Sequence, residues 1–202
     1  MTFNGKVFVK YKRIVVKVGT HSICGEDGTP SKEKIASFGL QIVALMQNGV
    51  EVVLVSSGAV GAGARFLLDG AKPKTLSLKQ ACASVGQPIL MTMYRDFFKS
   101  HHIEVGQILL TGDVLSCRER FLNARNTFFT LLKKGVLPIV NENDSISVEE
   151  IKLGDNDQLA VAVGSIVEAD MNFILSDIEG LYENFGTPHQ KILSQIKKIT
   201  PE

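Results

Sequence analysis

The chain has 202 residues, of which 45% are hydrophobic and 21% charged, so it is long enough to bury a substantial core. Its formal net charge of +1 argues against a nucleic-acid partner or an anionic membrane surface, because both are bound through clustered positive charge. Its three cysteines lack C-x-x-C spacing, which argues against a disulfide framework or a zinc site. Without a signal-peptide pattern or a membrane-length apolar run, we expect a cytoplasmic protein with no membrane partner.

The first quarter of the chain alternates predicted strands with a helix. Residues Arg13–Val18 form a β-branched run that predicts a buried strand, and Glu51–Val55 predicts a second one. Residues His21–Pro30 are polar and glycine-rich, which predicts a loop or hairpin. Ser31 can cap a helix whose apolar residues recur at helical spacing as far as Met46.

A glycine-rich segment, Gly58–Gly63, follows the second predicted strand and leads into a helical pattern. A turn of this kind leaves backbone N–H groups free at a helix N-terminus, where an anion is stabilised. The glycines can instead serve only close packing of a helix on a strand. Their spacing is not that of a Walker loop, so both interpretations stay open.

The next helix is predicted to start at Ser77, where S-x-x-Q has the form of a capping box. Pro88 should kink or divide this helix, because proline lacks the N–H that a helix interior requires. The Gly-Gln-Pro sequence at this point either accommodates packing or brings Gln87 toward a ligand, and the sequence does not decide between the two.

The second half of the chain continues the alternation. It predicts strands at Val105–Leu110, Val136–Val140 and Met171–Leu175, and helices at Arg118–Lys134 and Asp157–Val167. Residues Ile178–Pro188 are loop-like, and Lys191–Ile199 is weakly amphipathic. Because strands alternate with helices, we predict an α/β fold in a single domain, a three-layer sandwich with helices on both faces of a mostly parallel sheet.

Polar or glycine-containing groups follow four of the predicted strands. They are Lys17 to Gly19, Ser56 to Gly58, Asn141 to Asp144, and Ser176 with Asp177. Because the carboxyl ends of parallel strands lie at one edge of a sheet, we expect these groups to meet there. A second polar cluster, Gly154 to Asp157, opens the next predicted helix. Turn and cap chemistry can explain either cluster alone, but two that flank a short connector favour a binding site.

This set combines a lysine, amides, carboxylates and backbone donors. It suits a phosphorylated nucleotide that faces a small polar substrate, and general-base chemistry fits less well because no histidine belongs to the set. Lys17 by itself can also be a structural lysine whose charged end reaches solvent.

Eight sequence pieces carry a resemblance to a known family, and they occur in that family's order. They are V-K-V-G-T (16–20), V-S-S-G-A-V-G-A-G (55–63), A-S-V-G-Q (83–87), G-Q-I-L-L-T (106–111), R-E-R-F-L-N-A-R-N-T (118–127), P-I-V-N-E-N-D (138–144), I-K-L-G-D-N-D-Q-L-A (151–160) and L-S-D-I-E-G-L-Y (175–182). With them the chain resembles the glutamate 5-kinases of the amino acid kinase family. N-E-N-D followed by G-D-N-D separates these from aspartate, uridylate and carbamate kinases. The resemblance implies transfer of the ATP γ-phosphoryl group to the γ-carboxylate of L-glutamate, the first step of proline biosynthesis.

The resemblance also implies roles for individual residues. Lys17 and Asp157 would be catalytic, Ser57, Asp144 and Asn156 would bind glutamate, and Lys17, Gly19, Ser176 and Asp177 would approach the nucleotide. Lys17 would offset charge on the transferring group, and Asp157 would orient Lys17. Magnesium would be held mainly by the ATP phosphates and water, so we expect no metal ligands from the protein.

The resemblance further implies a homo-oligomer with proline as a feedback inhibitor. Family members continue through a glycine-rich segment with a second phosphate-binding lysine, which residues 183–202 do not contain. We also expect no RNA-modification-like C-terminal domain of the kind that some members carry. We therefore expect residues 1–202 to be one kinase-like domain that lacks its C-terminal part. Two alternatives stay open, a catalytically impaired module that binds glutamate or proline and a related small-molecule carboxylate kinase.

Overall fold

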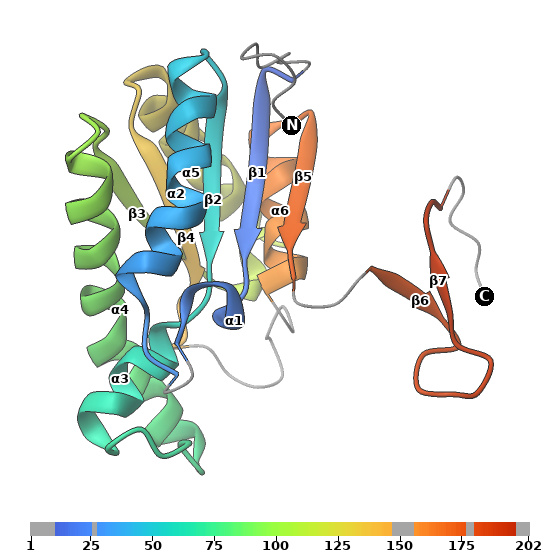
Figure 1. The fold of residues 1–202 in the computed structure, drawn as a ribbon. Coiled ribbons are helices and arrows are strands. Elements are labelled where there is room, and N and C mark those ends of the chain that lie inside the picture. The colour runs from blue at the N-terminus through green and yellow to red at the C-terminus, as the bar shows by residue number, and fades with distance from the viewer. Residues whose placement is uncertain (1–10, 26–27, 147–155, 177–179, 197–202) are drawn as a thin grey trace.

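The computed structural model describes residues 11–25, 28–146, 156–176 and 180–196, and its centre is a five-stranded parallel sheet (Figure 1). The strands are β1 (Arg13–Val18), β2 (Glu51–Ser56), β3 (Val105–Leu110), β4 (Leu137–Glu142) and β5 (Met171–Leu175), in the spatial order β3-β4-β2-β1-β5. Every pair of neighbouring strands is parallel. The predicted α/β fold with helices on both sides of the sheet is confirmed.

Two layers of helices cover the sheet. Helices α2 (Lys32–Gln47) and α4 (Leu76–Lys99) pack on one face, and α5 (Arg118–Lys133) and α6 (Asn156–Val167) pack on the other. Each face has its own hydrophobic cluster, because successive side chains of a strand point to opposite faces. This burial on both sides explains why the strands appear in the sequence as continuous apolar runs.

The order of the strands locates a crevice at the carboxyl edge of the sheet. The chain passes from β2 to α4 on one face, whereas β4 is followed by α6 on the other face. Strands β2 and β4 are neighbours, so the chain leaves these adjacent strands toward opposite faces of the sheet and opens a crevice between their ends. Ligands of open α/β sheets bind at such a switch point.

The segment after β1 differs from its prediction as a loop or hairpin. A short helix, α1 (Thr20–Ile23), begins directly after Gly19, and a bridge between Cys24 and Pro30 closes the rest of the segment in hairpin fashion. Lys34 of α2 donates from its Nζ to the carbonyl oxygen of His21 at 2.9 Å. A positive charge at the C-terminal end of a helix is favourable, so this contact ties α1 to α2.

Helix α3 (Ala59–Leu67) begins immediately after Gly58, whose φ of 100° is left-handed and suits glycine. Gly63 therefore lies inside a helix rather than in a turn. A Cβ placed on Gly63 would lie 1.8 Å from the carbonyl oxygen of Cys82, and one on Gly86 would lie 1.8 Å from that of Ala59. These two glycines allow the backbones of α3 and α4 to touch, which supports the packing interpretation of this segment.

Three further boundaries differ from the predictions. Helix α4 runs through Pro88 as one element, so proline does not divide it, and the alternative prediction of a kink at this point stays a prediction. Strand β4 continues two residues beyond Val140 and includes the buried Asn141 and Glu142. The chain after β5 forms an antiparallel pair, β6 (Leu181–Glu183) with β7 (Lys191–Leu193), which stands apart from the sheet in Figure 1. A short 3₁₀ helix, η1 (Gly112–Val114), follows β3.

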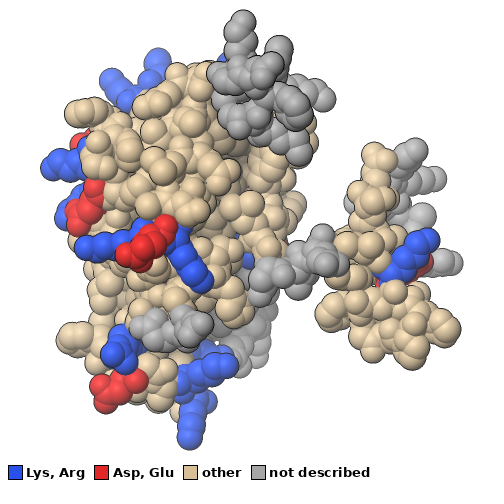
Figure 2. All heavy atoms as spheres, in the orientation of Figure 1, with Lys and Arg blue, Asp and Glu red and all other residues tan. Residues whose placement is uncertain are grey.

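Basic and acidic side chains are interspersed on the face that Figure 2 displays, as the small net charge would lead one to expect. Within the described ranges, no helix combines the length and apolar character that crossing a membrane demands.

Candidate functional site

Lys17 lies near the carboxyl end of β1 with its side chain only 6% exposed. Val15, two residues earlier, packs in the cluster under α5 and α6, and the two-residue period of a strand directs Lys17 to the same face. There its Nζ lies 2.6 Å from Oδ1 of Asp157, which occupies the first turn of α6. The structure thus brings together the two residues for which the sequence predicted catalytic roles.

The environment of this ion pair is asymmetric. A buried ammonium group is costly unless it is paired, and the Asp157 carboxylate provides the partner. Asp157 itself has a side chain that is 43% exposed, and its negative charge is favoured at the N-terminal end of α6. The pair therefore holds a positive charge at the edge of the sheet, with solvent on its Asp157 side.

Gly19 leaves space next to this lysine. A Cβ placed on Gly19 would lie 3.5 Å from Nζ of Lys17 and 3.8 Å from the carbonyl oxygen of Leu175. A side chain at position 19 would thus stand directly next to the ammonium group, at the point where β1 and β5 end side by side. A cation next to such a glycine is a suitable environment for a phosphate oxygen. Ser176 follows β5 and is exposed, and Asp177 lies outside the described residues.

A second pair of predicted residues also meets. Asn156, the first residue of α6, donates from Nδ2 to Oγ of Ser57 at 2.7 Å and to the carbonyl oxygen of Ser56 at 3.2 Å. The same nitrogen lies 3.1 Å from Oδ1 of Asn141 at the end of β4. Asn156 therefore joins the ends of β2 and β4 across the switch point of the sheet.

Asn141 and Gln87 extend this cluster, and neither was assigned a role from the sequence. Nδ2 of Asn141 donates to Oε1 of Gln87 at 3.0 Å, and both side chains are buried. The sequence held one signal for Asn141. It lies two residues beyond Ile139, which packs on the α4 face, so the two-residue period of a strand places Asn141 on that face as well. Gln87 could not be assigned in this way, because its partner lies 54 residues further along the chain.

Asp144, the third predicted glutamate ligand, lies three residues beyond Asn141 in the turn after β4 and is half-buried. The next residue, Ser145, has its Oγ 2.9 Å from Oγ of Ser84 in α4. The turn is also held by the N–H of Asn143, which donates to the carbonyl oxygen of Leu110 at 2.7 Å. These contacts place Asp144 at the same strand end as Asn141.

Tyr94 of α4 supports the end of β2 through a buried hydrogen bond. Its hydroxyl group lies 2.7 Å from Oγ of Ser56, and Ser56 Oγ also donates to the carbonyl oxygen of Ser57. Complete burial raises the pKa of Tyr94 well above its usual value, so the phenol stays protonated and can donate. The pair fixes the backbone from which Ser57 projects.

We expect Tyr94→Phe to lower the free energy of unfolding by about 1 kcal/mol, because it removes one buried hydrogen bond without changing the packed ring. Urea denaturation of both proteins measures this change. An exposed control, Thr92→Val on the same helix, removes a hydrogen bond to the carbonyl oxygen of Pro88 and should cost less. Equal stability of Tyr94→Phe and the wild type would contradict the supporting role of this hydroxyl.

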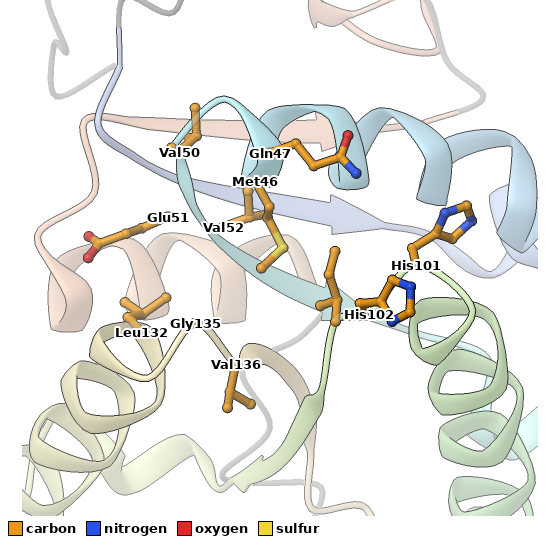
Figure 3. Close-up of a pocket in the computed structure, with 12 residues that line it drawn as sticks. Met46, Gln47, Val50, Glu51, Val52, His101, His102, Leu132, Gly135 and Val136 are labelled. Carbon is orange, nitrogen blue, oxygen red and sulfur yellow. The ribbon is translucent and has the colours of Figure 1, made fainter.

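A cavity of about 360 Å³ lies at the opposite, amino edge of the sheet (Figure 3). It is lined by the end of α2, the start of β2 and the turns that follow α4 and α5, with His101 and His102 on one side. The predicted site residues do not line it. In the portion of the chain that the structure describes, no group of three or more His, Cys, Asp or Glu side chains is arranged to hold a metal ion.

A parallel sheet with a buried lysine, an adjoining glycine and an amide cluster at its carboxyl edge offers a positive charge and hydrogen-bond donors where open α/β sheets bind ligands. Residues 12–202 match the amino acid kinase family, and the chain belongs to that family.

Relatives with curated names are similar over almost the whole chain. Glutamate 5-kinase of Syntrophotalea carbinolica is 49% identical over 193 residues, which are 95% of this chain and 52% of that protein. Glutamate 5-kinase of Dictyoglomus thermophilum is 51% identical over 172 residues, 85% of this chain and 46% of that protein. Glutamate 5-kinase of Citrifermentans bemidjiense is 44% identical over 195 residues, 96% and 52% respectively. The chain thus spans about half the length of the curated relatives it matches.

Proposed function

We propose that this chain carries the phosphoryl-transfer and glutamate sites of a glutamate 5-kinase, which transfers the γ-phosphoryl group of ATP to the γ-carboxylate of L-glutamate. The observation that carries the proposal is the ion pair between buried Lys17 and partly exposed Asp157, 2.6 Å apart, at the same sheet edge as the hydrogen-bonded Ser57–Asn156 pair. Relatives that match 95% of the chain and bear this enzyme's name support the choice of substrate.

The reaction asks little acid–base chemistry of the protein. A carboxylate is already a nucleophile, so the site must align it with the phosphoryl group and stabilise the negative charge that spreads over the transferring oxygens. Lys17 supplies that charge stabilisation, and its burial strengthens it because the local dielectric is low. Asp157 positions Lys17.

The glutamate side of the proposed site consists of three residues. Ser57 and Asn156 offer a hydroxyl and an amide at the switch point of the sheet, where they can bind the substrate's carboxylates. Asp144 provides a negative charge for the α-ammonium group. In this arrangement the α-ammonium group of glutamate faces a carboxylate, and its two carboxylates face neutral hydrogen-bond donors.

The nucleotide side consists of Lys17, Gly19, Ser176 and Asp177. Gly19 has no side chain next to the Lys17 ammonium group, which favours the approach of a phosphate group, and ATP would bring magnesium coordinated mainly by its own oxygens and by water. Feedback inhibition by proline and assembly into a homo-oligomer belong to the same proposal.

A single-turnover experiment tests the proposed function. The chain is mixed with ATP, magnesium and L-glutamate, and the acyl phosphate is trapped with hydroxylamine as the γ-hydroxamate. Formation of hydroxamate that depends on both ATP and glutamate supports the proposal. Binding of glutamate without hydroxamate formation would indicate a non-catalytic binding module, and activity with another carboxylate but not with glutamate would indicate a related kinase.

We expect Asp144→Ala to weaken glutamate binding about tenfold to a hundredfold, because a hydrogen bond to a charged group contributes about 1.5–3 kcal/mol. Isothermal titration with L-glutamate measures the effect. Asp96→Ala is a matched control, since Asp96 is an exposed carboxylate that lies 3.7 Å from Arg95 on α4. The same affinity in Asp144→Ala and Asp96→Ala would refute the role given to Asp144.

A further inference from the structure

We propose that Gln87 is a positioning residue that, together with the N–H of Glu142, holds the Asn141 amide in place and, through Asn141, helps to hold Asn156 in the glutamate site. This inference rests on the proposed function, because it concerns how the glutamate-binding residues are held. Gln87 is 8% exposed and Asn141 is 4% exposed, so bulk water does not compete for their side chains. Their hydrogen bond connects α4 to the end of β4.

The orientation of the Asn141 amide follows from a backbone group. The N–H of Glu142 can only donate, and it lies 2.9 Å from one side-chain atom of Asn141. That atom must therefore be the oxygen, so the nitrogen of Asn141 lies on the side of Gln87. Gln87 must then offer its own oxygen, as it does at 3.0 Å.

The orientation of Asn156 follows from the other end of the same chain of hydrogen bonds. The carbonyl oxygen of Ser56 can only accept, so the atom of Asn156 that lies 3.2 Å from it is the nitrogen. The same nitrogen lies 3.1 Å from the oxygen of Asn141. A rotation of the Asn141 amide by 180° would set nitrogen against nitrogen here and oxygen against oxygen at Gln87.

The position of Gln87 depends on its neighbours in α4. Gly86 allows α4 to approach the backbone of Ala59, and this close approach sets where the following residue stands. Pro88 removes the helical N–H that would otherwise bond one turn back, but α4 continues through it. The Gly-Gln-Pro sequence therefore accommodates close packing at Gly86 and also places the amide oxygen of Gln87 at the end of β4, while a role of Gln87 toward a ligand stays a prediction.

The test compares the affinity for L-glutamate of the 202-residue wild-type chain with that of Gln87→Met, which keeps the length of the side chain but removes the acceptor. We expect the Kd to rise about fivefold to tenfold, as for one buried amide left without its partner. We also expect the side-chain NH₂ resonances of Asn141 and Asn156 to shift in ¹⁵N NMR spectra. A folded Gln87→Met protein with wild-type affinity and unshifted resonances would overturn the proposal.

Two further variants separate positioning from general damage. Gln87→Glu keeps an acceptor oxygen facing Asn141 and should recover most of the affinity, whereas affinity no better than that of Gln87→Met would count against the proposal. Thr92→Val alters a hydrogen bond in the same helix away from the site and should leave both affinity and resonances unchanged. If Gln87→Met does not fold, Gln87→Glu alone tests the role of Gln87. Unshifted NH₂ resonances and a glutamate affinity within about threefold of wild type would support that role. Loss of either would overturn it.

Failure of this inference can be told from failure of the proposed function with Asn156→Ala. Weaker glutamate binding in Asn156→Ala but not in Gln87→Met would remove only the role of Gln87. Unchanged binding in both variants would remove the glutamate site itself.

Discussion

A Lys17→Met protein is expected to fold and to bind L-glutamate almost as the wild type does, yet to form γ-glutamyl phosphate at least about a thousandfold more slowly. Lys17 is the buried cation of the site, and its Nζ lies 2.6 Å from Asp157. In phosphoryl transfer such a charge acts mainly on the transition state, so its removal lowers the rate more than it lowers substrate affinity.

Methionine suits this test because folding should survive it. The stem of Lys17 is already packed in the sheet, and an unbranched thioether can take the same volume. The remaining Asp157 has a side chain that is 43% exposed, so water reaches its carboxylate, although the Oδ1 atom that faced Lys17 is itself buried. A fully buried carboxylate would instead have been left with a large desolvation cost.

Hydroxylamine trapping gives the rate, and titration with glutamate gives the affinity. Lys99→Met, at the exposed end of α4, is the matched control and should behave as the wild type in both measurements. If Lys17→Met is folded and retains its rate, Lys17 has the structural role that a lysine at the end of a strand can also have.

The layers of the fold followed from the sequence because their signals are local. Runs such as Val52–Val55 and Ile14–Val16 are apolar at every position, which is the pattern of strands buried on both faces, and the structure confirms it. The carboxyl-edge location of Lys17, Ser57 and Asn141 needed only the rule that parallel strands end on one side.

The partners within the site could not be predicted from local signals. Lys17 could be either structural or functional, because Asp157, which neutralises it, comes from a helix 140 residues later in the chain. Gln87 was ambiguous for the same reason. Hydrophobic periodicity predicts only local structure, so it cannot predict hydrogen bonds between residues so far apart in the chain. These partners become visible only in the folded structure.

Errors arose where tertiary contacts override a local rule. Proline commonly divides a helix, but α4 continues through Pro88, because residues before the proline pack closely on α3 and residues after it pack on the sheet face. The strand predicted at Val136–Val140 was expected to end before Asn141, yet β4 includes Asn141 and Glu142 because their backbones pair with Leu109 and Leu110 of β3. In both cases contacts with a neighbouring element outweigh the local rule.

Gly86→Ala is expected to lower the free energy of unfolding by at least about 2 kcal/mol, although the same change in an open helix would stabilise it by about 1 kcal/mol. The new Cβ would lie 1.8 Å from the carbonyl oxygen of Ala59 and 2.5 Å from the nitrogen of Gly63. Both obstacles are backbone atoms of α3, which no rotamer change can move. The helices must separate, and the cost of that separation exceeds the gain in helix propensity.

Gly164→Ala is the matched control, because this glycine also lies inside a helix but its added Cβ would meet only the side chain of Asn172. That side chain can rotate, so we expect a loss of less than about 1 kcal/mol. Urea denaturation of both variants measures the difference. Separation of α3 from α4 would also draw Gln87 away from Asn141, so glutamate affinity should fall in Gly86→Ala but not in Gly164→Ala. Equal stability of the two variants would show that α3 and α4 can yield at this contact, and would remove the reason for a glycine at position 86.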